Sequence, residues 1–140
     1  MTLKQIILPS LLSLGLVNSV FAERKQPILT GFLPVYQTLP SDFDLDKLTH
    51  LIYFSVIPSG DGSFSWTSGR DSLSMFNTFN KLKDKRGNGK TKLILSFGGT
   101  DAVGSGGFNT IAASAEITQT FVNNIFDLLE LWEADGVDID

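Results

Sequence analysis

Residues 135–140, with the sequence DGVDID, predict a short strand that carries two carboxylates on one face. Side chains alternate between the faces of a strand, so Asp138 and Asp140 point to one side, and Val137 and Ile139 to the other. Burying two carboxylates together is costly unless they share a proton or meet hydrogen-bond donors. The pattern therefore indicates either an active site or a solvated acidic strand end, and the preceding chain favours the active site.

The preceding chain alternates predicted strands with predicted helices. The strands are nearly continuous hydrophobic runs, typical of sheets buried on both faces, and cover residues 28–36, 48–57 and 92–97. A short helical turn is predicted from residue 40, and loops over residues 58–69 and 100–109. Amphipathic helices are predicted over residues 70–85 and 115–133. Their apolar faces are predicted to contain Leu73, Phe76, Phe79 and Leu82, and Ile117, Phe121, Ile125, Leu128 and Trp132.

This order of elements predicts βαβ units and a parallel sheet, either a doubly wound open sheet or a (β/α)₈ barrel. The dinucleotide-binding form of the open sheet needs a Gly-x-Gly-x-x-Gly motif after its first strand, and none is present. Barrel enzymes carry their catalytic residues at the carboxyl ends of strands, where residues 96–99 and the two aspartates fall. The sequence therefore favours a (β/α)₈ barrel with only its first four β/α units present, an incomplete barrel.

Composition narrows the class of partner. The 140 residues include no cysteine and one histidine, His50, and carry a formal net charge of −4. Nucleic acids and anionic membranes bind clustered Lys and Arg, so neither is expected as a partner. One histidine, no cysteine and a collinear pair of aspartates give no closed ligand set for a metal. No metal and no cofactor are therefore expected.

The first 22 residues have the layout of a secretory signal peptide. Lys4 precedes an apolar run over residues 6–17, and Val20 and Ala22 supply the aliphatic and small side chains at the −3 and −1 positions of a cleavage site. The run is shorter than the roughly 20 apolar residues that a membrane span needs. We expect cleavage after Ala22, a secreted protein, and a mature chain of residues 23–140.

Four segments together resemble a known family. Residues 31–34 (GFLP) and 49–53 (THLIY) are similar to its first and second strands, and residues 96–99 (SFGG) to its Ser-x-Gly-Gly motif. Residues 135–140 match six positions of its Asp-x-x-Asp-x-Asp-x-Glu motif. In this order and on these strands, the segments resemble the N-terminal half of the catalytic domain of glycoside hydrolase family 18, the chitinase family, over residues 23–140.

The resemblance implies hydrolysis of β-1,4-linked N-acetylglucosamine polymers by substrate-assisted retention. In that chemistry a Glu protonates the leaving oxygen, and the acetamide oxygen of the substrate attacks the anomeric carbon. Asp140 would hold the acetamide and stabilise the oxazolinium intermediate. Asp138 would share a proton with Asp140, because two neighbouring carboxylates resist being ionised together.

The resemblance also implies four substrate-binding residues. Ser96 could donate a hydrogen bond to the acidic row, and Gly98 and Gly99 would let the backbone approach the sugar. Asp135 is assigned at most a supporting role. Structural roles remain open, because Ser96 could be a small polar core residue, the glycines could mark a tight bend, and Asp135 could simply begin the strand. Three aromatic residues could stack on sugars or pack in the core: Tyr36, Trp66 and Phe108.

Two departures from the family pattern affect the expected activity. The general-acid Glu of the motif would be residue 142, so the 140-residue chain is expected to be inactive. The family has a small residue followed by Phe on strand two, whereas this chain has Phe54 and Ser55, so no strand-two aromatic is assigned. We therefore consider a fragment of a secreted chitinase-like glycosidase, a non-catalytic lectin-like relative that binds chitin or oligosaccharides, and a truncated product without function. Endo-acting N-glycan hydrolases share the strand-four motif and are not distinguished from chitinases.

Overall fold

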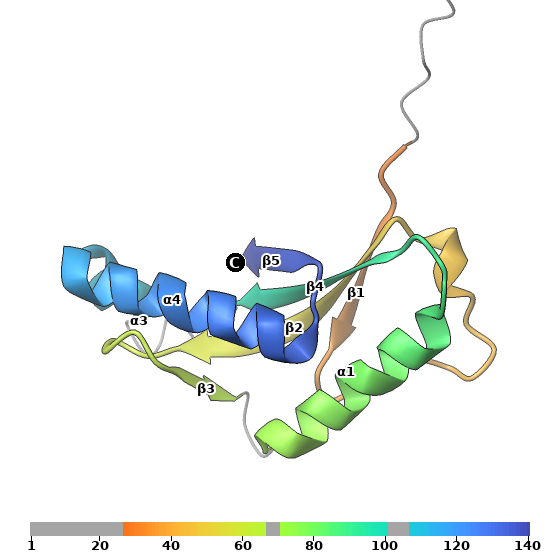
Figure 1. The fold of residues 1–140 in the computed structure, drawn as a ribbon, viewed down its shortest axis with the longest axis horizontal. Coiled ribbons are helices and arrows are strands. Elements are labelled where there is room, and N and C mark those ends of the chain that lie inside the picture. Colours follow the sequence, from red (N-terminus) through yellow and green to blue (C-terminus); the bar gives the residue numbers. More distant parts are fainter. Residues whose placement is uncertain (1–26, 67–70, 101–106) are drawn as a thin grey trace, which may run out of the picture.

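The computed structural model describes residues 27–66, 71–100 and 107–140. The predicted signal peptide, residues 1–22, lies outside the described residues. Four strands form a parallel sheet in the order β1-β2-β4-β5, and β3 joins it by antiparallel pairing with β2 (Figure 1). Their bounds are β1 Thr30–Pro34, β2 His50–Pro58, β3 Phe64–Trp66, β4 Lys92–Phe97 and β5 Gly136–Ile139. Parallel neighbours that follow one another in the chain are the arrangement expected for the wall of a (β/α)₈ barrel.

The two long helices, α1 (Ser72–Arg86) and α4 (Ala115–Trp132), lie on the same side of the sheet (Figure 1). Asp71 and Ser114 cap their first turns, by accepting hydrogen bonds from the backbone N–H groups of Ser74 (2.6 Å) and Ile117 (3.3 Å). α1 ends at Gly87, which adopts a positive φ of 52°. Asp71 and Ser114 thus fix the first residues of α1 and α4, and Gly87 ends α1.

The buried face of α4 agrees with the prediction, whereas the predicted face of α1 is partly wrong. Phe121, Ile125, Leu128 and Trp132 of α4 are all buried. In α1 the buried residues are Met75, Phe79 and Leu82, and Leu73 is 65% exposed. A pure spacing of three residues slips around a helix with 3.6 residues per turn, so residues 73, 76, 79 and 82 do not share one face.

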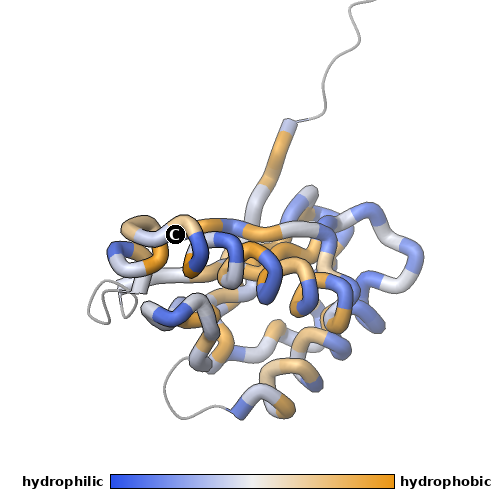
Figure 2. Tube along the Cα trace, turned by 60° about the vertical axis from the view of Figure 1, so that its left-hand side comes forward, coloured by the Kyte–Doolittle hydropathy of each residue, from blue (hydrophilic) through white to orange (hydrophobic). Residues whose placement is uncertain are grey.

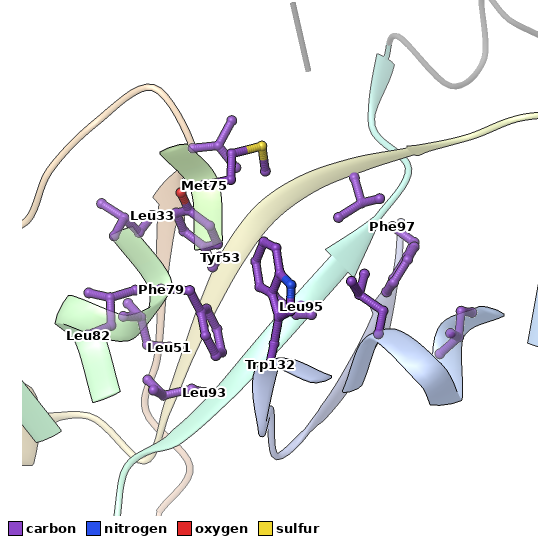
Figure 3. Packing of buried hydrophobic residues seen from close by; sticks show 14 of the residues in the cluster. Leu33, Leu51, Tyr53, Met75, Phe79, Leu82, Leu93, Leu95, Phe97 and Trp132 are labelled. Carbon is purple, nitrogen blue, oxygen red and sulfur yellow. The ribbon is translucent and has the colours of Figure 1, made fainter. Parts of the chain in front are cut away.

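The hydrophobic core lies between this side of the sheet and the helices (Figure 3). Figure 2 shows hydrophobic residues along the central strands and an alternation of hydrophobic and hydrophilic residues in the helices. Trp132, 2% exposed, stacks on Trp66 with a centroid distance of 5.4 Å and also contacts Phe79 at 5.4 Å. The helices of the described residues all contribute to this one cluster, whose members include Leu51, Leu93, Leu95 and Phe97 of the strands and Ile111 of α3.

The side of the sheet away from the helices carries the even-numbered residues of β4 and β5. Phe32 of β1, on this side, is 63% exposed and packs edge-on against Phe54 of β2 at 5.9 Å. In a complete barrel this side of the sheet would be the interior.

Three short elements differ from the prediction. β3 lies inside the predicted loop 58–69, α3 (Gly107–Ala112) begins inside the predicted loop 100–109, and a 3₁₀ turn, η1, covers Leu45–Lys47 rather than starting at residue 40. Elements of three to six residues contain too few periods for a hydrophobic pattern to be read. Among the described residues, no helix has both the length and the apolar character needed to cross a membrane.

Candidate active site

Ser96 and Asp138 meet at the carboxyl end of the sheet. The register of β4 and β5 places the two residues opposite each other, on the side away from the helices. The Ser96 hydroxyl donates a hydrogen bond to Oδ2 of Asp138 over 2.8 Å, and Ser96 is 1% exposed. The hydrogen bond expected from the sequence is therefore present, and it fixes the orientation of the Asp138 carboxylate.

Asp140 follows β5 and is held through its backbone. Its N–H donates to the Phe97 carbonyl over 2.9 Å, and its own carbonyl accepts from the Gly99 N–H over 3.3 Å. Gly98 and Gly99 have positive φ angles of 128° and 90°, and a Cβ at Gly98 would overlap the Asp140 carbonyl group. Glycine is thus required at residue 98 both for its backbone conformation and for the close approach of Asp140.

Ser55 joins this group, and the sequence did not reveal it. A register shift between Tyr53 and Val56 gives β2 an extra residue opposite β4, and the peptide bond between Phe54 and Ser55 is cis. Ser55 is buried, and its Oγ lies 3.5 Å from the position that a Cβ of Gly99 would occupy. Oδ2 of Asp140 lies 3.8 Å from the same position. The hydroxyl and the carboxylate therefore both lie close to Gly99.

Asp135 does not lie with the other predicted site residues, because it precedes β5 at the opposite end of the strand. Its carboxylate accepts hydrogen bonds from Arg86 (2.5 Å), Lys92 (3.1 Å) and the Leu93 N–H (2.8 Å). Partial burial alone would raise the pKa of Asp135, but the Leu93 N–H and the two cations outweigh it and lower the pKa below its ordinary 3.8. These contacts join α1, β4 and β5, and they give Asp135 a structural role.

The three aromatic residues considered as sugar platforms occupy different environments. Trp66 stacks on Trp132, and Phe108 packs edge-on against Phe121 at 6.0 Å, so both belong to the core. Tyr36, just after β1, is largely exposed. His50 lies at the start of β2, with Nδ1 2.9 Å from the Thr49 hydroxyl, and it lines the same open pocket as Asp138.

The assembled group offers two carboxylates at the carboxyl end of the sheet, next to the glycine backbone of residues 98 and 99. Ser96 holds one carboxylate, and Gly99 lies beside the second, at the carboxyl end where barrel enzymes place their sites. Within the described ranges, no group of three His, Cys, Asp or Glu residues could hold a metal ion. The geometry suits the binding of an uncharged or positively charged group next to Asp140.

Comparison with known proteins places this geometry in a family. The family described as "Glycosyl hydrolases family 18" matches residues 22–140. The chain belongs to glycosyl hydrolase family 18. The matched residues include the motifs at 96–99 and 135–140, at the ends of β4 and β5, which carried the resemblance.

Relatives of this family 18 chain include chitinases. The protein named "Putative chitinase 1" of Margaritifera margaritifera is 30% identical over 102 residues, which are 72% of this chain and 21% of that protein. A chitinase crystal structure from Rhizomucor miehei is 25% identical, with a TM-score of 0.65, over 81% of this chain and 28% of that one. The Group IV chitinase of Ostrinia furnacalis, in complex with allosamidin, is 25% identical, with a TM-score of 0.64, over 82% and 33%.

The chain spans about a third or less of the length of these proteins. The predicted fold class, the first part of a (β/α)₈ barrel, is confirmed by these structures and by the parallel order β1-β2-β4-β5. The roles of Asp138, Asp140, Ser96, Gly98, Gly99 and Asp135 toward a substrate stay predictions.

Proposed function

We propose that this chain supplies the first part of the active site of a chitinase-like glycosidase that hydrolyses β-1,4-linked N-acetylglucosamine polymers. The observation that carries the proposal is the pairing of Ser96 with Asp138, beside Asp140, at the carboxyl ends of β4 and β5. The allosamidin complex of the similar Ostrinia furnacalis chitinase supports a ligand of this class.

In the proposed mechanism, the acetamide of the bound sugar is the nucleophile. Asp140 accepts a hydrogen bond from the acetamide N–H and directs the acetamide oxygen at the anomeric carbon. The bond from this carbon to the leaving oxygen breaks as an acid protonates that oxygen, and a cyclic oxazolinium forms. Its positive charge is stabilised by the nearby carboxylates, which are already oriented before the reaction. Water then opens the oxazolinium with retention of configuration.

Asp138 and the glycines support Asp140 in this scheme. Ser96 donates to Asp138, which fixes that carboxylate two residues before Asp140. The protonating acid follows Asp140 by two residues in the family motif. A polypeptide of residues 1–140 alone carries no such residue, so we propose that it does not hydrolyse the substrate.

The test uses the full-length protein that carries these residues and a chromogenic chitobioside. Wild-type protein is expected to release the chromophore, and Asp140→Asn to lose activity by roughly 10²-fold or more, as when one preorganised electrostatic group is removed. Asp127→Asn, which removes an equal charge from the exposed side of α4, is the control and is expected to act as wild type. Full activity of Asp140→Asn would refute the proposed role.

The same experiment separates the lectin-like alternative. Binding of chitin oligomers by the full-length protein without any hydrolysis would indicate a non-catalytic relative, and absence of both binding and hydrolysis would refute both functions.

We also propose export, supported by the apolar run and cleavage pattern of residues 1–22. Mass analysis of protein recovered from the culture medium, with Glu23 as its first residue, is the expected result.

A further inference from the structure

We propose that Asp135 is a positioning residue for Asp138, because it fixes the register in which β5 pairs with β4. The proposal rests on the function proposed for the site, in which Asp138 supports Asp140. Asp135 forms two hydrogen bonds with one residue of β4, Leu93. Its N–H donates to the Leu93 carbonyl over 2.8 Å, and its Oδ2 accepts from the Leu93 N–H over 2.8 Å. Asp135 therefore clamps both backbone polar groups of Leu93.

The clamp lies three residues before the pair of side chains that it aligns. Leu93 precedes Ser96 by three residues along β4, and Asp135 precedes Asp138 by three residues at the start of β5. The register between these two positions runs without a break. A pairing fixed at Leu93 therefore places Ser96 opposite Asp138, where the hydroxyl donates to Oδ2 over 2.8 Å.

The alternation of side chains does not select this register by itself. A shift of β5 by one residue would turn its side chains to the wrong faces, whereas a shift by two residues keeps each side chain on its face. Shifted by two residues, β5 could place Asp140 instead of Asp138 opposite Ser96. β5 has only four residues, and β4 is its one neighbour among the described strands, so contacts at its two ends weigh heavily. The backbone of Asp140 bonds to Phe97 and Gly99 at the carboxyl end, and the Asp135 clamp holds the amino end.

Two cations hold the carboxylate in the clamp. Arg86 of α1 donates to Oδ2 of Asp135 over 2.5 Å, and Lys92 of β4 donates to Oδ1 over 3.1 Å. Their long side chains can follow a small movement of the carboxylate, whereas the two bonds to the Leu93 backbone define one position along β4. The ion pairs thus stabilise the contact, and the bonds to Leu93 set the register.

The first experiment separates these two parts by NMR. It follows the carboxyl carbon resonance of Asp138 in ¹³C-labelled full-length protein without sugar. Asp135→Asn keeps an acceptor for the Leu93 N–H and loses the ion pairs. Asp135→Glu keeps the charge, but its additional methylene carries the carboxylate past the Leu93 N–H. The Asp138 resonance is expected to move in Asp135→Glu, because its hydrogen bond from Ser96 is then misaligned.

Lys83→Gln is the matched control. Lys83 of α1 pairs with Glu133, just before β5, over 3.1 Å, and its side chain is 19% exposed, close to the 20% of Arg86. Asp135→Asn is expected to move the Asp138 resonance no further than this control does. A larger shift in Asp135→Asn would overturn the proposal, whether or not Asp135→Glu folds. A shift in Asp135→Glu no larger than in the control would also overturn it.

The second experiment measures the coupling of Asp135 to Ser96 through chitobioside hydrolysis by the full-length protein. Ser96→Ala is expected to lower kcat roughly tenfold in wild-type protein but less than about threefold in Asp135→Glu, where the hydroxyl is already misaligned. In Lys83→Gln it should again cost roughly tenfold, because distant and independent substitutions add. An equal loss in the Asp135→Glu and wild-type backgrounds would overturn the proposal. If wild-type protein does not hydrolyse chitobioside, the proposed function fails, and the Asp138 resonance alone decides whether Asp135 positions Asp138.

Discussion

Replacing Asp135 by Asn should destabilise the fold through the loss of one charge at the amino end of β5. Asn keeps the size of the side chain and can still accept the hydrogen bond from the Leu93 N–H. It cannot form the ion pairs with Arg86 and Lys92 that join β5 to α1 and β4. The substitution therefore isolates the electrostatic part of this contact.

The expected size of the effect follows from the exposure of the three side chains. Asp135 and Arg86 are each 20% exposed and 2.5 Å apart, so their charge-assisted hydrogen bond should contribute about 1–2 kcal/mol. Lys92 is 57% exposed at 3.1 Å, and solvent screening should reduce its share to about 0.5 kcal/mol or less. We expect Asp135→Asn to lower the free energy of unfolding by about 1.5 kcal/mol at neutral pH.

The effect should depend on pH with a defined sign. The folded protein lowers the pKa of Asp135 below its ordinary 3.8, so the charged form stabilises the fold at pH values above 3.8. This stabilisation is lost as the pH falls from 3.8 through the lower pKa of the folded state. The difference in stability between wild type and Asp135→Asn should therefore be full at pH 7 and should shrink below pH 3.8.

Urea unfolding of the full-length protein, followed by tryptophan fluorescence at pH 7 and pH 3, provides the measurement. Asp127→Asn is the control for loss of a negative charge without a described ion pair, and its effect should be small at both pH values. Equal stability of wild type and Asp135→Asn at pH 7 would refute the assignment of Asp135 as a structural anchor. A loss of the same size at pH 3 would refute the electrostatic explanation.

Three further predictions concern the site and the core. Ser96→Ala should reduce chitobioside hydrolysis by the full-length protein by roughly tenfold, because Asp138 loses its 2.8 Å donor, and wild-type kcat would contradict this. Gly98→Ala should prevent folding or destabilise the protein by more than about 3 kcal/mol, because a Cβ there would overlap the Asp140 carbonyl. Gly87→Ala, where a Cβ meets nothing closer than 3.9 Å, should cost less, about 1–3 kcal/mol of backbone strain from its positive φ of 52°. Similar thermal midpoints for the two variants would be inconsistent with a close approach at Gly98. Trp132→Ala should cost about 3–5 kcal/mol in urea unfolding, since the side chain is buried against three aromatic rings, and a loss below about 1 kcal/mol would argue against its central place in the core.

The regular elements could be predicted because their patterns are local. The strand predicted over residues 92–97 has these bounds in the structure, and α4 differs from its prediction by one residue at its C-terminal end. In each of these two elements the hydrophobic pattern extends over the whole length, and the pattern stops where the element ends. β1 is shorter than predicted, Thr30–Pro34 rather than 28–36, because its ends are set by pairing with β2 and not by its own residues.

The part of the candidate site that lies along one strand could be predicted from the sequence. The alternation of side chains along 135–140 predicts Asp138 and Asp140 on one face, and the motif at 96–99 predicts Ser96 near them. The structure shows the contact between Ser96 and Asp138. Ser55 was missed because the extra residue in β2 becomes visible only against β4. Asp135 was grouped with the site because it is close in sequence, but its partner Arg86 is 49 residues away.

The amino-acid sequence by itself determined which segments become strands and helices, which side of the last strand carries the carboxylates, and the family to which the motifs belong. These properties depend on the spacing of neighbouring residues, and each is set within one element. Only the tertiary structure decided that Ser96 donates to Asp138, that Ser55 and Asp140 both lie close to Gly99, and that Asp135 is held by cations. Those contacts depend on the register between strands, which the packing of the whole sheet against α1 and α4 fixes.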